Sequence, residues 1–228
     1  MSAARRSPAP QAAKNPAVSD IARRREERRN ATGRRSDSRW TQIQAGATEV
    51  FRRLGYANST LEDVAAQVGV RRATLYYYVA TKEELLVSLL SGPIRDLRAN
   101  LETIATRDVP AREKLTTALV EYTRVLGTHP ELTIFNQENV HKVMSGPAAD
   151  ELIDNADRYG NVLTEVVRHG VAAGELRADV DPRVAVMGLL GMFNWMHRWF
   201  DPAGRLTLDE VAAGFITMAL DGLAVPAS

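Results

Sequence analysis

The strongest constraint on the fold lies in residues 60–79, where two short helical patterns flank a glycine. Thr60 followed three residues later by Asp63 is a capping box, in which each side chain bonds the other residue's backbone N–H at a helix start. Gly69 supplies the positive φ that a tight turn between helices needs, and Val70 is placed to fill the corner after it. The sequence therefore predicts two short helices that meet at a sharp angle.

The second helical pattern gathers cationic and hydroxyl side chains. Residues 71–78 hold two arginines, a threonine and three tyrosines. Arginine bonds guanine through two donors, and threonine or tyrosine hydroxyls donate to phosphates or contact thymine methyl groups. This composition is typical of the recognition helix of a helix-turn-helix, which lies in the major groove of DNA. The alternative for each tyrosine is a packing role, because Leu75 and one tyrosine face have to be buried.

Three sequence elements in and around this motif carry a family resemblance, namely Gly55-Tyr56, Thr74-Leu75-Tyr76-x-Tyr78 and Lys82-Glu83-Glu84-Leu85. With them, residues 39–86 resemble the DNA-binding domain of the TetR family of transcriptional regulators. Val79 departs from the family pattern, which has Phe at this place. As another apolar residue, it is expected to keep the same packing role.

The resemblance implies base contacts from one side of the second helix and phosphate contacts from its other residues and from the following helix. The expected base contacts are Arg72, Ala73, Thr74 and Tyr77, and the expected phosphate contacts are Tyr76, Tyr78 and Lys82. Arg71 and Thr60 complete the predicted DNA-binding set, with capping alone as the alternative role for Thr60.

The apolar periodicity predicts an all-α fold with three parts. A disordered basic arm is expected over 1–37, a three-helix DNA-binding head over 38–85, and a helical ligand-binding and dimerisation bundle over 86–228. Gly55 is expected to end the first helix of the head, and Pro93 to kink or break the long helix that begins near Thr81. Further helices are predicted at 111–127, 131–144, 148–173, 182–200 and 208–222.

Composition narrows the class of protein. The chain has no cysteine and no run of 18 apolar residues, so we expect neither disulfides nor a membrane span, and a cytoplasmic location. Its four histidines show no metal-ligand spacing, and no nucleophile or phosphate-loop motif is present. We therefore expect no catalytic residues, no metal and no cofactor. The remaining alternative to a DNA-binding regulator is a helical interaction protein that does not bind DNA.

Two apolar stripes near the C-terminus predict a homodimer. Val186, Leu189 and Phe193 repeat at spacings of three and four, and Phe215 and Met218 belong to a second stripe of the same kind. The family resemblance implies that the last two helices pair with those of a second subunit, so that two heads read a palindromic operator in double-stranded DNA. The alternative is that these residues are ordinary core of one subunit.

The segment 194–206 resembles TetR members that govern fatty-acid and steroid breakdown, several of which sense acyl-CoA thioesters. The resemblance implies a repressor released by a small amphipathic effector such as an acyl-CoA, with a hydrophobic drug effector of an efflux regulator as the alternative. Asn194 and His197 are further candidate contacts. The predicted ligand-binding residues are Leu97, Leu101, Tyr122, Phe135, Asn139, His141, Leu163, Val166, His169 and Trp195.

The charge distribution predicts a role for the arm. Residues 1–39 hold eleven Arg or Lys and four Asp or Glu, a net charge of +7 that leaves −6 for the rest of a chain with net charge +1. We expect deletion of residues 1–35 to weaken binding to all duplexes, and to flatten the dependence of log K on log salt by about 0.9 for each phosphate that the arm neutralises. Salt titrations of both forms on one duplex measure this. An unchanged slope would identify the arm as a solvated leader.

Overall fold

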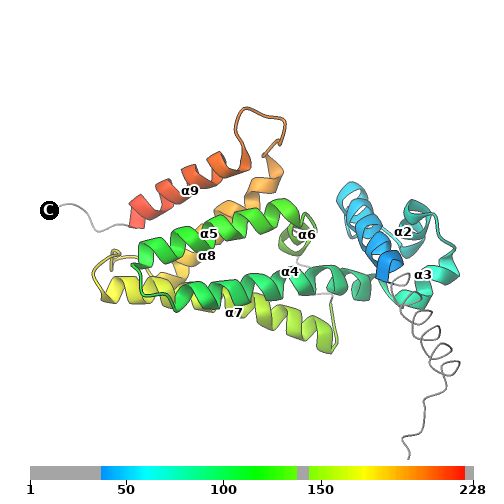
Figure 1. Cartoon of the computed structure of the whole chain (residues 1–228), viewed down its shortest axis with the longest axis horizontal. Coiled ribbons are helices and arrows are strands. Elements are labelled where there is room, and N and C mark those ends of the chain that lie inside the picture. Colours follow the sequence, from blue (N-terminus) through cyan, green and yellow to red (C-terminus); the bar gives the residue numbers. More distant parts are fainter. Residues whose placement is uncertain (1–36, 138–143, 224–228) are drawn as a thin grey trace, which may run out of the picture. The chain divides into compact units, whose positions relative to one another are not determined.

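The computed structural model describes residues 37–137 and 144–223, and every regular element in these ranges is a helix (Figure 1). The predicted all-α fold is therefore confirmed, while the predicted arm lies outside the described residues except for Asp37. After a helix over 37–54 come α2 (Leu61–Val68), α3 (Arg72–Tyr78), α4 (Lys82–Ala105), α5 (Ala111–Thr128), α6 (Leu132–Gln137), α7 (Pro147–Ala172), α8 (Pro182–Trp195), the 3-10 helix η2 (Met196–Arg198) and α9 (Leu208–Leu223).

The local signals at residues 60–79 act as predicted. The Thr60 hydroxyl accepts from the Asp63 N–H at 3.2 Å, and the Thr60 N–H donates to the Asp63 carboxylate at 2.9 Å. Gly69 takes φ 69° and ends α2 in the left-handed conformation. Leu75 and Val79 are buried, so the apolar residue at 79 keeps the packing role expected of it. These contacts fix the angle between α2 and α3.

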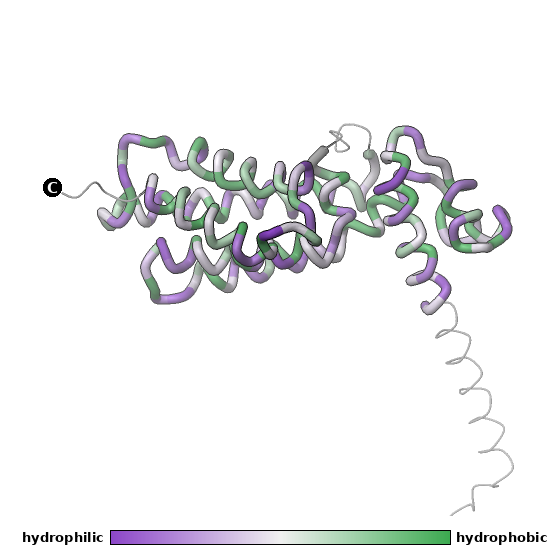
Figure 2. Tube along the Cα trace, turned by 90° about the horizontal axis from the view of Figure 1, so that it is seen from above, coloured by the Kyte–Doolittle hydropathy of each residue, from purple (hydrophilic) through white to green (hydrophobic). Residues whose placement is uncertain are grey.

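Behind the head, the helices pack through their apolar faces. α4 lies along α7, α5 packs on α7 and α9, and α8 packs on α7. Figure 2 shows hydrophobic and hydrophilic residues alternating along these helices, as expected for amphipathic helices that bury one side. None of the helices within 37–137 and 144–223 is long and apolar enough to cross a membrane.

The prediction for Pro93 is wrong about a break, because α4 continues through it to Ala105. A proline removes one intrahelical hydrogen bond. The buried side chains on both sides of it, including Leu90, Ile94 and Leu97, hold the helix against its neighbours and offset that loss.

Two other helix ends differ from the prediction. α5 runs one residue past Gly127, whose role is close packing: a Cβ there would lie 2.6 Å from Leu208 Cδ2 at the start of α9. α8 ends at Trp195 and tightens into η2, where the prediction had one helix to residue 200. Asp181 and Pro182 begin α8 as predicted, with the Asp181 carboxylate accepting from the N–H groups of Arg183 and Val184.

Candidate DNA-reading face and effector cavities

α3 turns most of its side chains to solvent. Leu75 is its buried anchor, Tyr78 is half-buried, and Tyr77 is 83% exposed. The Tyr77 and Tyr78 rings meet edge to face, with centroids 5.4 Å apart. The packing role is therefore divided between Leu75 and Tyr78, and the other predicted contacts on α3 and at its start are exposed: Arg71, Arg72, Ala73, Thr74, Tyr76 and Tyr77.

Arg72 is held by two neighbours on this face. Its Nε lies 2.8 Å from a Glu62 carboxylate oxygen of α2, and a terminal guanidinium nitrogen donates to the Tyr76 hydroxyl at 3.3 Å. The guanidinium also lies over the Tyr76 ring, 5.1 Å from its centroid. The Tyr76 hydrogen bond and the Glu62 charge raise the pKa of Arg72. The cation is thus pre-oriented, but part of its donor fork is occupied before DNA arrives.

Lys82, the first residue of α4, is also engaged within the head. Its ammonium donates to the carbonyls of Tyr56 at 2.7 Å and Ser59 at 2.9 Å, with Ala57 O at 3.4 Å. It lies 4.3 Å from the centroid of the Tyr56 ring. A phosphate would have to compete with these carbonyl acceptors for the Lys82 ammonium. The sequence pattern did not predict the carbonyl contacts. Thr60, exposed at the start of α2, is engaged in the capping box.

A cavity of about 440 Å³ lies among α4–α8 and gathers part of the predicted ligand set. It brings together Leu97, Tyr122 and Phe135, but Leu101, Leu163, Val166, His169 and Trp195 do not line it, and Asn139 and His141 lie outside the described residues. Leu101 and Leu163 are fully buried in helix packing, whereas Trp195 is exposed. We call this space the inner cavity. Its walls are Ile94, Leu97, Tyr122, Leu126, Leu132, Phe135, Ile153, Ala156, Asp157, Tyr159, Met187, Leu190 and Asn194.

A pair of stacked tyrosines dominates the polar chemistry of the inner cavity. The rings of Tyr122 and Tyr159 lie 5.6 Å apart, and the Tyr122 hydroxyl donates to the Asn194 side-chain oxygen. Tyr159 is 6% exposed, and its hydroxyl has no hydrogen-bond partner among residues 37–137 and 144–223. Burial raises the pKa of Tyr159 well above its usual value, so it remains a neutral O–H donor. Sequence reasoning missed Tyr159, although its position in the amphipathic 148–173 pattern was available.

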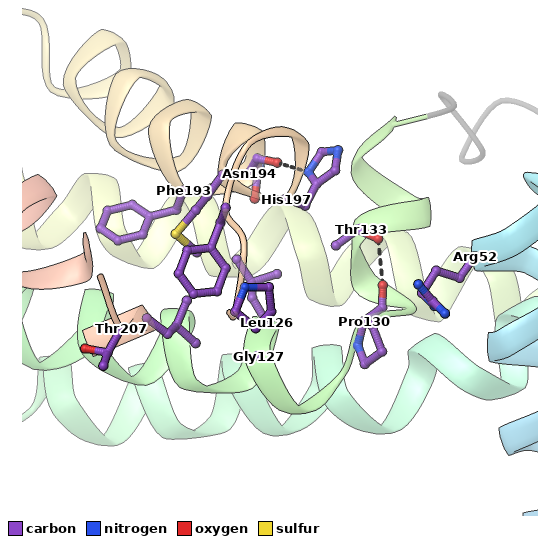
Figure 3. A pocket seen from close by; sticks show the side chains of 13 residues that line it. Arg52, Leu126, Gly127, Pro130, Thr133, Phe193, Asn194, His197 and Thr207 are labelled. Carbon is purple, nitrogen blue, oxygen red and sulfur yellow. Dashed lines mark hydrogen bonds between the residues drawn. The ribbon is translucent and has the colours of Figure 1, made fainter. Parts of the chain in front are cut away.

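A second cavity of about 690 Å³, the outer cavity, lies between α5 and the α8–α9 connection (Figure 3). The His197 ring Nδ1 lies 2.6 Å from the Asn194 backbone oxygen, and its buried Nε2 has no hydrogen-bond partner in the part of the chain that the structure describes. Asn194 and His197 were further sequence candidates, and both line this cavity. Its walls are Arg52, Leu126, Gly127, Pro130, Thr133, Phe193, Asn194, Met196, His197, Phe200, Pro202, Thr207 and Leu208.

The predicted dimer residues separate into two groups. Val186, Leu189 and Phe193 are buried within the subunit, and Phe193 is only 1% exposed, which agrees with the alternative that they are core of one subunit. Phe215 is half-buried and meets Phe193 edge to face at 5.5 Å. Met218 is 61% exposed and remains available. A three-four stripe shows that a helix has a buried side, but not whether its own subunit or a partner covers it.

We expect the Arg72 pairing to tune DNA binding. Glu62→Gln removes an anion beside the reading face and frees the guanidinium, so affinity for all duplexes should rise by up to about fivefold while base preference falls. Arg72→Ala should relax preference at one operator position, at a cost of about 1–3 kcal/mol. Anisotropy titrations on an operator and a base-substituted copy measure both effects. Glu49→Gln, which breaks the similar Glu49–Arg52 pair outside α3, is the control.

For Lys82, we expect a stability effect that needs no DNA. Lys82→Met removes a charged donor from the carbonyls of Tyr56 and Ser59, which should lower the free energy of unfolding by about 1–3 kcal/mol. Denaturant unfolding of the free protein measures this change. If Lys82→Met keeps the stability of the parent but binds all duplexes more weakly, the role of Lys82 is phosphate contact rather than stabilisation of the head.

Comparison with known proteins places these features in a family. A model of the tetR family of bacterial regulatory proteins matches residues 43–89. A model of the tetracyclin repressor-like C-terminal domain matches residues 108–223, which is half of the chain.

Relatives of known role span most of the chain. The transcriptional repressor KstR2 of Rhodococcus jostii (strain RHA1) is 26% identical over 189 residues, which cover 82% of this chain and 92% of that protein. The fatty acid metabolism regulator protein of Bacillus subtilis (strain 168) is 26% identical over 67% of this chain and 78% of its own length. The structure of AibR in complex with isovaleryl coenzyme A and operator DNA matches with a TM-score of 0.69 and 25% identity, over 79% of this chain and 97% of that one. The chain belongs to the TetR family of bacterial transcriptional regulators.

Proposed function

We propose that the protein is a transcriptional repressor that binds a palindromic operator as a homodimer and leaves it when an acyl-CoA thioester binds. It would act in the cytoplasm. The observation that carries the proposal is the exposed face of α3, where Arg72 and Tyr77 stand outside a buried Leu75 anchor. A helix presented in this way suits a major groove. Occupancy of a promoter by two such heads blocks transcription directly.

An exposed apolar surface on α8, on α9 and at Trp199, just after η2, supports the homodimer. Glycines within it have open space where a Cβ would stand, which permits a second helix to approach closely. Large apolar side chains that lie exposed together on one surface are typical of an interaction site. We call it the α8–α9 face, and it comprises Val184, Met187, Gly188, Gly191, Trp195, Trp199, Gly214 and Met218.

The effector class rests on relatives and cavity volume together. AibR has been solved with isovaleryl coenzyme A and operator DNA, and the Bacillus subtilis relative regulates fatty acid metabolism. Both cavities of this chain fall within the range of about 300–1,000 Å³ typical of ligand sites. An effector acts by binding one arrangement of the two heads more tightly than the other, which is a coupling of about 1–3 kcal/mol in most proteins.

We expect Met218→Glu to give monomers, because it places an unpaired charge in an apolar contact between subunits. The protomer should stay folded, since Met218 is mostly exposed. Light scattering measures the mass, and circular dichroism checks the helices. Val120→Glu, at an exposed apolar position of α5, is the matched control and should remain dimeric. An intact Met218→Glu dimer would exclude this part of the α8–α9 face as the interface.

The proposal as a whole is tested on the DNA upstream of the protein's own gene. The purified protein should shift this fragment in a gel, and octanoyl-CoA should reverse the shift while free CoA does not. Release by hydrophobic drugs but not by octanoyl-CoA would support an efflux regulator instead. Failure to bind any operator selected from random duplexes would reject the DNA-binding function.

A further inference from the structure

The inner and outer cavities share part of one wall. Leu126 and Asn194 line both, and the Tyr122 hydroxyl bonds the Asn194 side chain from the inner side. We infer that the two cavities hold a single elongated ligand, with its acyl end in the inner cavity and an amide-bearing, anionic arm in the outer one. This inference rests on the proposed function, because an acyl-CoA thioester is a molecule of this kind. Beyond that function, it specifies which end of the ligand lies in which cavity and which side chains bind each part.

The charges set the direction. Among the described residues, Asp157 is the one fixed charge in the inner wall, and Arg52 is the one fixed charge in the outer wall. An anionic group is repelled by the first and attracted by the second. The phosphates of the ligand therefore lie toward Arg52, which belongs to the helix over 37–54 in the DNA-binding head (Figure 3). There they compete with Glu49, whose carboxylate is 3.0 Å from the Arg52 guanidinium.

Tyr159 supplies the donor in the inner cavity. A buried hydroxyl without a partner is rare in proteins and is satisfied when a ligand brings an acceptor. The Tyr159 ring stacks on the Tyr122 ring, and Tyr122 bonds Asn194 in the shared wall. Only the Tyr122 ring therefore separates Tyr159 from that wall. The thioester carbonyl, at the junction of the acyl chain and the arm, is the acceptor placed there.

His197 supplies an acceptor in the outer cavity. The Asn194 carbonyl only accepts, so the Nδ1 of His197 carries the proton in their hydrogen bond. In the neutral imidazole, Nε2 then has a lone pair, which is buried and receives no hydrogen bond from the described residues. The pantetheine arm of coenzyme A carries two amide N–H groups. One of these donates to His197 Nε2 in our placement.

Three variants test the placement by calorimetric titration of the full-length protein. The probes are octanoyl-CoA, octanoyl-N-acetylcysteamine, which keeps the thioester and one amide but has no phosphate, and octanoate. Tyr159→Phe and His197→Ala should each weaken both thioesters by about tenfold, the loss of one hydrogen bond to a buried group. Arg52→Gln should weaken octanoyl-CoA alone. Because no described residue bonds the Tyr159 hydroxyl, Tyr159→Phe should melt no lower than the parent.

Matched controls separate recognition from folding. Tyr56→Phe makes the same chemical change in the head, outside both cavities, and should leave every affinity unchanged. Leu126→Trp fills the shared wall and should abolish thioester binding, whereas Val120→Trp, on the outward side of the same helix, should not.

The outcomes distinguish the two levels of the proposal. Octanoyl-CoA that releases the operator from all three variants as it does from the parent would overturn the two-cavity placement and leave the proposed function standing. Octanoyl-CoA that neither binds the parent protein nor releases its operator would overturn both. An Arg52→Gln variant that loses affinity equally for both thioesters would overturn the assigned direction.

Discussion

The structure depends on α4, because this one helix contacts the DNA-binding head at its start and lines the inner cavity further along. At its start, the Thr81 hydroxyl accepts from the Glu84 N–H, and the Lys82 ammonium holds the carbonyls that follow the helix over 37–54. Further along, its buried leucines lie against α7, and Leu97 lines the inner cavity. Ligand-induced movement of α4 would thus reach the head through an ion–carbonyl contact rather than through a flexible loop. Helices transmit displacement with little loss because their backbone bonds are internal.

The local features of the fold were predictable because they depend on residues close in sequence. The Thr60–Asp63 capping box, the left-handed Gly69 and the Asp181-Pro182 helix start each involve a few consecutive residues with strong conformational preferences. The all-α class follows from periodicity alone. Gly127 shows the limit: it resembled a helix end, but the approach of Leu208, 81 residues later, is what requires a small residue there.

The candidate site was predicted less well, since its contacts join distant residues. The spacing of Val186, Leu189 and Phe193 identified a buried side of α8, but burial by α7 and burial by a partner give the same pattern. The exposed Met187 and Trp195 lie on other sides of the same helix. For Lys82, a cation near a recognition helix suggested phosphate, while its carbonyl acceptors lie 23 to 26 residues earlier. Tyr159 became informative only when the structure showed its hydroxyl buried, with no hydrogen bond to any residue it describes.

Asn194 lines both cavities and lies near the end of α8, and its hydrogen bonds connect the two cavities to that helix end. Its side chain accepts from Tyr122 on α5, and its backbone carbonyl accepts from His197 in η2. α8 ends one residue later and tightens into η2, so the side chains on either side of this junction follow different helical paths. A ligand that bonded Tyr159 and His197 would act on one partner of Asn194 directly, His197, and on the other, Tyr122, through the ring that stacks on it. The next residue, Trp195, is exposed on the α8–α9 face. A shift at this junction would therefore move part of the proposed contact between subunits. The spacing of the two DNA-reading heads depends on that contact, which gives a physical route from an acyl ligand to operator affinity.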